Sequence, residues 1–599
     1  PFPRLQALDL ALHKHKIDWR LFGRMLLQRR TLCSGVASCS QSVPVLLPVF
    51  PSLNAPFATL PSAGLRTSPW LCEWYRRLDR LTVLAKGAAV EAPRHHQTPG
   101  QGVSKVNVIY KFGGSSVRDA ERMREVADIV GSFPQYLPCV VLSAMGKTTN
   151  MLLECGDLAL KTKTENISNL TPLKNIRKLH LDTCDDLGIE PVVRSEVERL
   201  INELEQLLIG ISIMQDLTPR AKDSLVSFGE RLATRIFASY LRTKGVPARQ
   251  HDAWDLGLTT TDDFTNADVI YEASLPAIAA ALAPKPGQPV EIPIVTGFLG
   301  RGQLSGAITT LGRGGSDLTA TVLGAALELP EVQVWKDVDG VLTSDPRIVP
   351  STRPVTELTF EEATELAYFG AQVLHPQAMQ PAIRSGKMNV RVKNSYNREA
   401  AGTIISAARD MSCTVVTSIV LKSNVTLVDI ISSRMMGQYG FLATVFDTFR
   451  RHKISVDVVA TSEVSVSLTL DPKKIAGAPD DELSQVQHEL GMMAAVSFRK
   501  GLAIISLICN VEKTSEILMR AFSVFQREGI NVLMMSQGAS KTNISLVVDG
   551  SRGTEAVQVL HREFFDGPSV CSITGLPLSQ GVSVGLGNNG SSNGDHSNN

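Results

Sequence analysis

The stretch VNVIYKFGGSSV, residues 106–117, decides the fold of this chain. Alternating apolar residues in VNVIY predict a short strand that ends at Lys111. Gly113 and Gly114 then lead into RDAERMREVADIV, residues 118–130, whose apolar spacing indicates an amphipathic helix. A strand that turns through glycines into a helix gathers free backbone N–H groups, and the helix dipole favours an anion there. The stretch therefore predicts a phosphate site; the alternative is an ordinary βα turn with a surface lysine.

Length and composition describe a folded protein of several domains. The 599 residues suffice for three or four domains of ~150 residues. With 43% apolar residues, 20% charged residues and a net charge of +1, the chain offers no electrostatic argument for a nucleic-acid partner. Its nine cysteines show no CxxC spacing, which favours free thiols in a reducing compartment over a metal site. No apolar run reaches the ~18 residues of a membrane span, so no membrane partner is expected.

The two ends of the chain differ from the middle. Residues 1–100 are poor in acidic residues and rich in arginine and serine, a composition typical of an organelle transit peptide that is removed after import. The alternative is a disordered leader without an address. Residues 581–599 are rich in Gly, Asn and Ser, which predicts a disordered tail.

Strands and helices alternate over residues 106–400. CVVLSAMG (139–146) and PVEIPIVTGFLG (289–300) are apolar strands that end in small-residue turns, and a long helical pattern covers 220–245. This alternation predicts an α/β fold, with an open, mainly parallel sheet and helices on both faces. Ligands bind such sheets at the carboxyl ends of the strands, where Lys111 lies.

An internal repeat follows after residue 400. VFDTFRRHKISVDVV (445–459) aligns with AFSVFQREGINVLMM (521–535), and VSLTLD (466–471) aligns with ISLVVD (544–549). Each copy reads as strand, helix, strand, strand, which is typical of a small α+β module of the βαββαβ type. We therefore expect two such modules after the parallel sheet.

Five motifs in this order resemble the aspartate kinases of the amino-acid kinase family. They are KFGGSS (111–116), VLSAMGKTTN (141–150), SFGER (227–231), TTLGRGGSD (309–317) and KDVDGVLTSDPR (336–347). The two small modules resemble the ACT domains that follow such kinases. The resemblance covers residues 106–570 and implies a carbamate kinase-like catalytic domain at 106–400 and ACT domains at 415–490 and 495–570. It also implies transfer of phosphate from ATP to L-aspartate, with Mg²⁺ as a cofactor.

The phosphate-binding candidates lie at one edge of the predicted sheet. Phosphoryl transfer needs mainly positioning and electrostatic stabilisation of the moving group. Lys111 and the turn at Gly113 and Gly114 supply charge and N–H donors for the nucleotide. Ser143 ends a strand at the same edge and is a candidate donor to phosphate or substrate; the alternative is a helix cap. By resemblance, Thr149 and Ser316 also belong to the substrate site.

Two charged residues suit a dicarboxylate amino acid. Arg313 lies in a glycine turn, where a guanidinium can reach a carboxylate with two hydrogen bonds. Glu230 lies in a mainly apolar helix and is the candidate partner of the substrate ammonium; the alternative is a solvated position beside Arg231. A carboxylate nucleophile is ionised at neutral pH and needs no general base. Asp317 is therefore predicted to orient Lys111 or a magnesium ion; the alternative is an acid that complements a helix dipole. The resemblance places Lys111, Glu230, Arg313 and Asp317 in the active site.

The loop KDVDGVLTSDPR resembles the nucleotide loop of the family. By this resemblance Lys336, Asp337 and Arg347 line the ATP pocket. Many bacterial relatives have Thr where Lys336 stands and Lys where Gln372 stands, whereas plant enzymes resemble this chain in WKDVDGVLT and FGAQVLHPQ. We interpret the loop as the variant found in plant chloroplast enzymes, and we expect the protein in the plastid stroma.

The first small module resembles the lysine-binding ACT copy of the family. The resemblance places eight residues around the effector: Met435, Gln438, Gly440, Phe441, Leu442, Asp457, Ser462 and Glu463. The second copy has Leu533 where the first has Asp457, so we expect one binding copy and one structural copy. Lysine is the expected feedback inhibitor, with S-adenosylmethionine as a further effector, in a homo-oligomer joined through the ACT domains. The alternative is that both copies only dimerise.

Three functions compete at this stage. The first is aspartate kinase, the first step toward lysine, threonine, methionine and isoleucine. A kinase for glutamate, acetylglutamate or a nucleotide is the alternative of the same class, and the paired modules and SFGER count against it. A non-catalytic amino-acid sensor is the alternative from another class, which the presence of Lys111, Glu230, Arg313 and Asp317 in one chain disfavours.

Overall fold

The computed structural model describes residues 105–284, 287, 289–371, 374–432, 439–462, 464–475, 479–538 and 540–566. These residues all belong to one unit, Arg94–Asn599. The predicted leader and tail lie outside the described residues, and so do Met435, Gln438 and Glu463.

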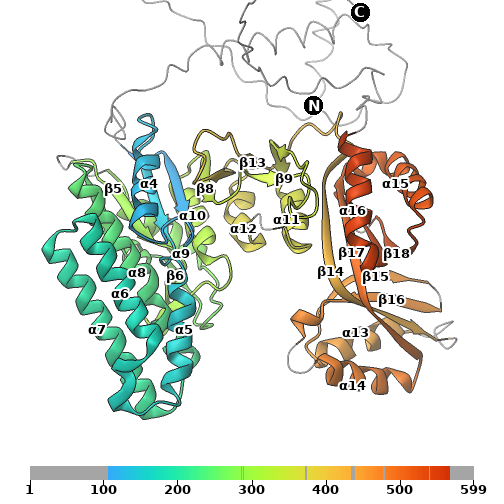
Figure 1. Cartoon of the computed structure of the whole chain (residues 1–599), viewed down its shortest axis with the longest axis horizontal. Helices are drawn as coiled ribbons and strands as arrows, with labels where there is room; N and C mark the ends of the chain where they lie inside the picture. The colour runs from blue at the N-terminus through green and yellow to red at the C-terminus, as the bar shows by residue number, and fades with distance from the viewer. Residues whose placement is uncertain are drawn as a thin grey trace, which may run out of the picture. The chain divides into compact units, whose positions relative to one another are not determined.

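An eight-stranded sheet forms the frame of the first part of the described chain (Figure 1). Its order is β11-β13-β12-β8-β1-β2-β5-β3, and every pairing is parallel except that of β12 with β13. The strands are β1 (Val108–Phe112), β2 (Pro138–Leu142), β3 (Ala248–His251), β5 (Ile292–Thr296), β8 (Glu331–Lys336), β11 (Glu357–Thr359), β12 (Asn389–Asn394) and β13 (Thr403–Ser406). The predicted open, mainly parallel sheet is confirmed. Because β1 lies inside the sheet between β8 and β2, Lys111 reaches the carboxyl edge at its middle.

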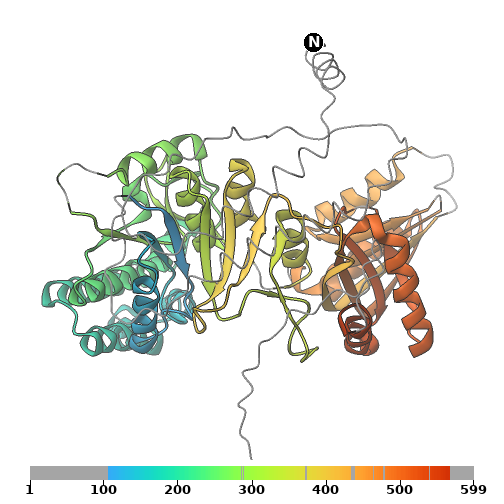
Figure 2. The ribbon, with the colours of Figure 1, turned by 90° about the horizontal axis from the view of Figure 1, so that it is seen from above.

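Both faces of this sheet are covered by helices (Figure 2). Along β1, Val108, Tyr110 and Phe112 enter one hydrophobic core, whereas Ile109 enters the other. The first core packs against α4 (Ala120–Gly131), α5 (Thr148–Ala159), α6 (Thr171–Leu187), α7 (Pro191–Met214) and α8 (Pro219–Thr243). The second packs against α9 (Tyr271–Ala281), α10 (Gly315–Ala326), α11 (Phe360–Tyr368) and α12 (Pro376–Ser385). Burial on both faces explains why the central strands are apolar throughout.

Local sequence signals set the ends of α8, the helix that contains Glu230. Thr218 is its N-cap and accepts a hydrogen bond from the backbone N–H of Ala221 at 3.1 Å, and Pro219 takes the first helical position. Gly245 follows the last turn with a φ of +78°, a conformation that glycine adopts without strain. The helix predicted over 220–245 is therefore confirmed.

Short strands complete the first part of the chain. They are β4 (Thr259–Thr260), β6 (Leu299–Gly302) and β7 (Ile308–Thr310) in one small sheet, and β9 (Val341–Leu342) and β10 (Pro354–Val355) in another. Among the described residues, no helix has the length and apolar character needed to cross a bilayer.

The two small modules share one six-stranded antiparallel sheet with the order β15-β16-β14-β17-β19-β18. Its strands are β14 (Val416–Ile431), β15 (Val456–Thr461), β16 (Ser465–Leu470), β17 (Ala495–Cys509), β18 (Val532–Ser536) and β19 (Asn543–Asp549). Its helices are α13 (Phe441–Arg451), α14 (Pro479–Gly491), α15 (Thr514–Glu528) and α16 (Gly553–His561).

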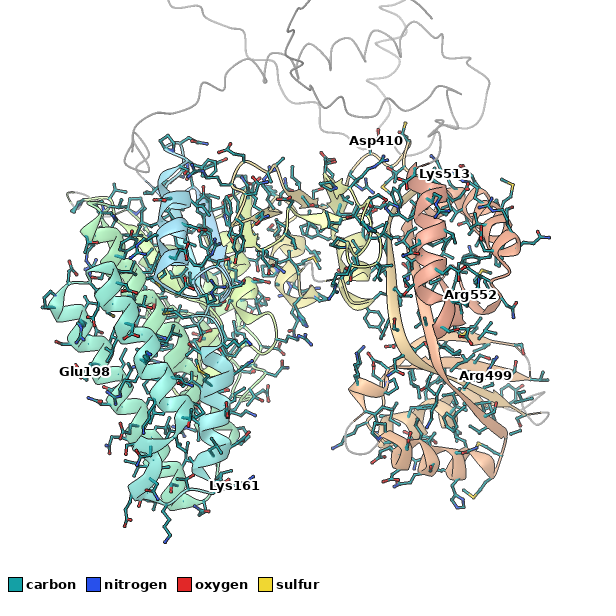
Figure 3. All side chains as sticks on the ribbon, in the orientation of Figure 1. Lys161, Glu198, Asp410, Arg499, Lys513 and Arg552 are labelled. Carbon is teal, nitrogen blue, oxygen red and sulfur yellow. The ribbon has the colours of Figure 1, made fainter. Side chains whose placement is uncertain are left out.

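The long strands β14 and β17 run through both modules. Residues 426–431 of β14 pair with β16 in the first module, whereas residues 416–423 pair with the half of β17 that also pairs with β19. In the first module, Arg499 of β17, labelled in Figure 3, donates to the carboxylate of Asp429 of β14 at 2.8 Å. The internal repeat did not indicate that the start of β14 completes the sheet of the second module.

Candidate active site

Lys111 and Asp317 form the charged centre of the site. Lys111 lies at the end of β1, Asp317 lies in the first turn of α10, and Nζ and Oδ1 are 2.6 Å apart. Each residue is only 8% exposed. Burial acts to raise the pKa of Asp317, but Lys111 and Lys336 together lower it below its usual value. Asp317 therefore contacts Lys111, and its role in orienting Lys111 stays a prediction. The alternative of a surface lysine is wrong, because Lys111 is buried.

Glycines let three segments approach one another at this edge. A Cβ on Gly114 would lie 2.8 Å from the carbonyl oxygen of Ala144, and a Cβ on Gly229 would lie 2.6 Å from the Cβ of Ala144. The turn after β2 is therefore held between the turn after β1 and α8, which explains the glycine of SFGER. A Cβ on Gly113 would lie 3.6 Å from Nζ of Lys111, so the turn runs alongside the lysine ammonium.

Glu230 is a buried carboxyl group with one oxygen unused. It is 3% exposed, and its Oε1 accepts a hydrogen bond from the backbone N–H of Ala144 at 3.1 Å. Its Oε2 is buried and has no hydrogen-bond partner among the described residues. Burial raises the pKa of Glu230 to about 8, against the opposing effects of the Ala144 hydrogen bond and of Lys111. The alternative of a solvated position is wrong, and the free oxygen calls for a cationic donor.

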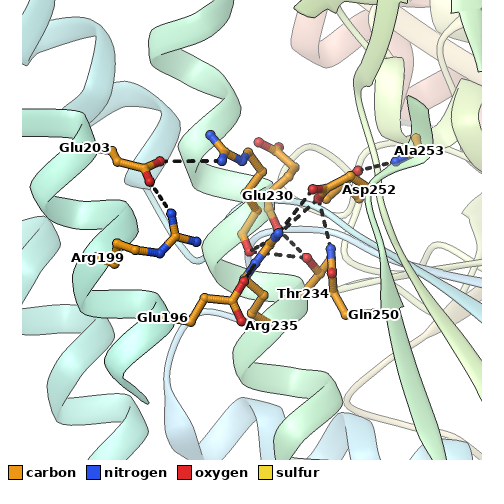
Figure 4. A network of polar contacts seen from close by, with 11 residues as sticks. Glu196, Arg199, Glu203, Glu230, Thr234, Arg235, Gln250, Asp252 and Ala253 are labelled. Carbon is orange, nitrogen blue, oxygen red and sulfur yellow. Dashed lines mark hydrogen bonds and ion pairs between the residues drawn. The ribbon is translucent and has the colours of Figure 1, made fainter. Parts of the chain in front are cut away.

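Ion pairs on neighbouring residues of α8 fix the direction of Glu230 (Figure 4). Arg235 pairs with Glu196 of α7 at 2.7 Å and with Asp252, which precedes η2 (Ala253–Leu256), at 3.2 Å. Arg231 lies 3.8 Å from Glu203 of α7. These contacts on two sides of α8 resist its rotation, so the Glu230 carboxyl group stays directed at the turn after β2.

Ser143 joins the turn after β2 to α10. Its Oγ donates a hydrogen bond to Oγ of Ser316 at 3.0 Å. Ser143 is not a helix cap, because α5 begins at Thr148 with Lys147 in the N-cap position. Thr149, half-buried in the first turn of α5, follows directly. Neither α5 nor α10 has a side-chain cap, but the first N–H group of each helix already donates to a backbone carbonyl: Thr148 to Met145 and Gly315 to Gly312. Only the N–H groups that follow in the first turns are left for an anion.

Arg313 lies between two glycines with left-handed backbones, Gly312 (φ +67°) and Gly314 (φ +78°). Gly314 also makes room for His375, since a Cβ on Gly314 would lie 2.4 Å from the Cβ of His375. Burial lowers the pKa of His375, the Arg313 charge lowers it further, and Asp317 opposes both. His375 is therefore close enough to both Arg313 and Asp317 to feel their charges. His375 was not among the site residues predicted from the sequence.

Lys336 ends β8 next to the same charged pair. Burial lowers the pKa of Lys336, Asp317 acts against this, and Lys111 lowers the pKa further. Asp337 follows as an exposed residue. The side chain of Arg347 is 85% exposed and pairs with Asp345 at 2.6 Å. Lys336 is therefore brought to the site, whereas no described contact joins Arg347 to it.

The predicted nucleotide loop is bonded directly to the six-stranded sheet. The backbone N–H of Ile419 in β14 donates to the carbonyl oxygen of Thr343 at 2.8 Å, and Ser344 Oγ donates to the carbonyl oxygen of Ile419 at 2.9 Å. Oγ1 of Thr343 lies 2.9 Å from Nε2 of His561 in α16, and His561 is fully buried. A shift of the sheet would therefore move this loop.

Comparison with known proteins identifies the family. The amino acid kinase family model matches residues 107–394, and an ACT domain model matches residues 428–479 and 505–564. Aspartokinase 1, chloroplastic, of Arabidopsis thaliana is 57% identical over 463 residues, which cover 77% of this chain and 80% of that protein. The chain belongs to the aspartokinase family. The lysine-sensitive aspartokinase 3 of Escherichia coli is 36% identical over 461 residues, which cover 77% of this chain and 99% of the relative.

Solved structures agree with the aspartokinase assignment. Escherichia coli aspartokinase III in complex with lysine and aspartate (T-state) is similar with a TM-score of 0.64 at 35% identity, over 77% of this chain and 99% of that chain. The same enzyme in complex with aspartate and ADP (R-state) gives a TM-score of 0.63 at 35% identity, over 77% of this chain and 100% of that chain. The amino-acid kinase fold followed by ACT domains is thus confirmed, and so is the assignment to the kinases that phosphorylate a carboxyl group.

The first ACT module of this aspartokinase contains five of the predicted effector residues within the described part of the chain. Gly440 (φ +86°) is the N-cap of α13, and Phe441 and Leu442 follow in its first turn. Oγ of Ser462 lies 2.7 Å from Oγ of Ser465. These contacts leave the effector roles as predictions.

Asp457, the fifth of these residues, already has cationic partners. Its side chain is fully buried and pairs with Lys422 and with Lys474, the latter at 3.3 Å. Tyr368 of α11 donates a hydrogen bond to the same carboxylate at 3.0 Å. An ammonium group that arrives at Asp457 would therefore exchange with a lysine of the chain.

Proposed function

We propose that this chain catalyses transfer of the γ-phosphoryl group of ATP to L-aspartate, forming 4-phospho-L-aspartate and ADP, with the residue roles given below. The observation that supports these roles is the unused, buried Oε2 of Glu230, together with the interactions that connect Glu230 with Lys111, Lys111 with Asp317, and both Asp317 and Arg313 with His375. An amino acid with a second carboxylate fits this pattern, because its ammonium donates to Glu230 while a carboxylate accepts from Arg313.

The nucleotide phosphates bind where positive charge and N–H groups meet. Lys111 and Lys336 together outweigh the single negative charge of Asp317, and the turn at Gly113 and Gly114 adds backbone donors. Fixed charges at the moving phosphoryl group stabilise the transition state more than the ground state. Ser143, Ser316 and Thr149 position the substrate carboxylate and phosphate from the turn after β2, from α10 and from α5. Asp337 and Arg347 complete the nucleotide site.

The attacking group is the ionised side-chain carboxylate of aspartate, so the site needs no general base. Asp317 holds the Lys111 ammonium in place and directs it at the phosphates. Mg²⁺ fits as an ion that arrives with the nucleotide, since it is bound through phosphate oxygens, waters and one or two carboxylates. The described residues contain no group of three or more His, Cys, Asp or Glu that would hold it alone. When bound, it neutralises charge on the phosphates.

We assign residues 106–400 to the catalytic domain, 415–490 to an effector-binding ACT domain and 495–570 to a second ACT domain. Lysine is the proposed feedback inhibitor at the first ACT domain, S-adenosylmethionine a further effector, and the ACT domains join a homo-oligomer. The bonds of Thr343 and Ser344 to β14 and α16 support this proposal, because they connect the regulatory sheet to the nucleotide loop.

The plastid stroma is the proposed location, with residues 1–100 as the transit peptide and the reaction as the first step toward lysine, threonine, methionine and isoleucine. A fusion of residues 1–105, placed behind a start methionine, to a fluorescent protein tests the location in leaf cells. Fluorescence confined to chloroplasts supports it, and fluorescence throughout the cytosol contradicts it.

A coupled ADP-release assay with aspartate, glutamate or buffer alone tests the activity, with hydroxylamine added to trap the acyl phosphate. We expect ADP release and hydroxamate only with aspartate. Equal rates with glutamate would favour a kinase for another acidic substrate. Lysine binding without any aspartate-dependent ADP release would favour the non-catalytic sensor.

A further inference from the structure

A cavity of about 470 Å³ lies between the catalytic domain and the regulatory sheet. It is formed by α11 together with β15, β18 and β19, so the second ACT module provides two of its walls. The polar lining residues that matter here are Glu365, Tyr368, Asp457, Ser536, Asn543 and Ser545. Apart from Asp457, none of them belongs to the catalytic site or to the predicted effector residues.

Asn543 lines this cavity and has an unused acceptor. The residue is 7% exposed, and its amide nitrogen donates to Oε2 of Glu365 at 3.2 Å and to Oγ of Ser545 at 3.1 Å. Its Oδ1 is buried and has no hydrogen-bond partner among the described residues. Because both amide hydrogens are already engaged, the orientation that leaves Oδ1 free is fixed by its neighbours. A buried acceptor in this state is satisfied only by a donor from outside the chain.

The cavity also carries one negative charge without a counter-charge. Asp457 pairs with Lys422 and Lys474, and Lys422 also pairs with Asp471 at 3.3 Å, so these four residues are balanced. Glu365 makes no ion pair within the described part of the chain and receives only the Asn543 amide. The unbalanced carboxylate lies next to the free acceptor, which favours a ligand that is both a donor and a cation.

The rest of the lining suits a short hydrocarbon chain. Val458, Val459, Phe369 and the ring of Tyr368 line the cavity beside the polar residues. The hydroxyl of Tyr368 is engaged with Asp457, so its ring is held in place as a wall. A ligand of this size with one charged end and one apolar end matches both halves of the lining.

We propose that this cavity binds a small protonated aliphatic amine, whose ammonium donates to Oδ1 of Asn543 and faces Glu365 while its carbon chain lies along Tyr368. The second ACT module then contributes to a ligand site of its own. Occupancy would act on α11, and the chain runs on from α11 to His375, which packs against Gly314 beside Arg313. A bound amine therefore changes the affinity for the acidic substrate.

The test uses n-butylamine, which is protonated at pH 7.5, with n-butanol and butyrate as probes of the same length but different charge. Titrations of the full chain by saturation-transfer NMR give the affinity of each probe. We expect saturable binding of n-butylamine alone, weakened at least 10-fold in Glu365→Gln and in Asn543→Leu. Glu361→Gln, an exposed position on the same helix, is the matched control and stays within twofold. Thermal unfolding of each variant verifies folding, and Glu365→Gln suffices if Asn543→Leu does not fold.

Three results would overturn the proposal. They are the absence of saturable n-butylamine binding, equal binding of butyrate, and an unchanged affinity in Glu365→Gln, which would place the amine at Asp457 or elsewhere. In the same samples, saturating n-butylamine is expected to shift KM for aspartate at least threefold in the wild type and not in Glu365→Gln. An unshifted KM would refute the connection between this cavity and Arg313.

Discussion

Replacement of Glu230 by glutamine should make the free protein more stable at high pH and, at the same time, weaken its binding of substrate. The folded-state pKa of Glu230 is about 8, against 4.5 for an unperturbed glutamate. Because the folded state holds its proton more tightly, it binds more protons than the unfolded state between these two values. Folding stability therefore falls as the pH rises through this window. Glutamine has the shape of the protonated acid and no charge, so Glu230→Gln removes this loss.

The magnitude follows from the size of the pKa difference. A raised pKa of this size corresponds to roughly 5 kcal/mol of stability lost across the whole window, at 1.36 kcal/mol for each pKa unit. Between pH 5.5 and pH 8.5 the stability of Glu230→Gln should increase by about 3 kcal/mol relative to the wild type. Saturating aspartate should stabilise only the wild type, because the substrate ammonium supplies the donor that Oε2 lacks.

Urea unfolding of both proteins at the two pH values measures this difference, with and without aspartate, and the ADP-release assay measures the loss of turnover. Glu198→Gln, an exposed glutamate on α7 labelled in Figure 3, is the matched control and should show no pH-dependent gain. A stability difference that does not change with pH would refute the raised pKa. An unchanged KM for aspartate in Glu230→Gln would refute its contact with the substrate.

Three further variants test the roles of Lys111, Arg313 and His561. Lys111→Met should lower kcat by about 100-fold or more, because it removes a fixed charge at the phosphoryl group. Lysine binding, measured by calorimetry, should stay intact. Equal loss of turnover and of lysine binding would indicate misfolding. Arg313→Lys should raise KM for aspartate by roughly 10-fold and leave KM for ATP within about twofold, since an ammonium cannot form the paired hydrogen bonds of a guanidinium. Equal rises in both KM values would contradict the role of Arg313 in binding the substrate carboxylate. His561→Leu removes the buried partner of Thr343 and should raise the lysine concentration for half-inhibition about fivefold. The kcat measured without lysine should not change. An unaltered inhibition curve would exclude His561 as the connection between the regulatory sheet and the nucleotide loop.

Local patterns in the sequence were sufficient for the elements that hold the catalytic residues. The strand, glycine turn and helix around Lys111 appear as β1 and α4, and the helix that carries Glu230 begins and ends at residues marked by Thr218 and Gly245. These features depend on neighbours within a few positions of the chain, so composition and spacing report them.

Long-range pairings could not be predicted in the same way. The start of β14 pairs with the end of β17 across about 90 positions, as in Val416 with Cys509, and no periodicity within either strand indicates the partner. Likewise, Lys422 lies on a different strand from Asp457, and the sequence alone did not show their ion pair. His375 had one local signal, the proline after it at the start of α12, but its contact with Gly314 exists only in the folded chain.

A crystal structure of the complex with aspartate and ADP tests the proposed substrate and nucleotide contacts most directly. We expect the substrate ammonium within about 3 Å of Oε2 of Glu230, a carboxylate on Arg313, and the terminal phosphate of ADP at Lys111. Aspartate bound without contact to Glu230, or a nucleotide bound away from Lys111, would contradict it.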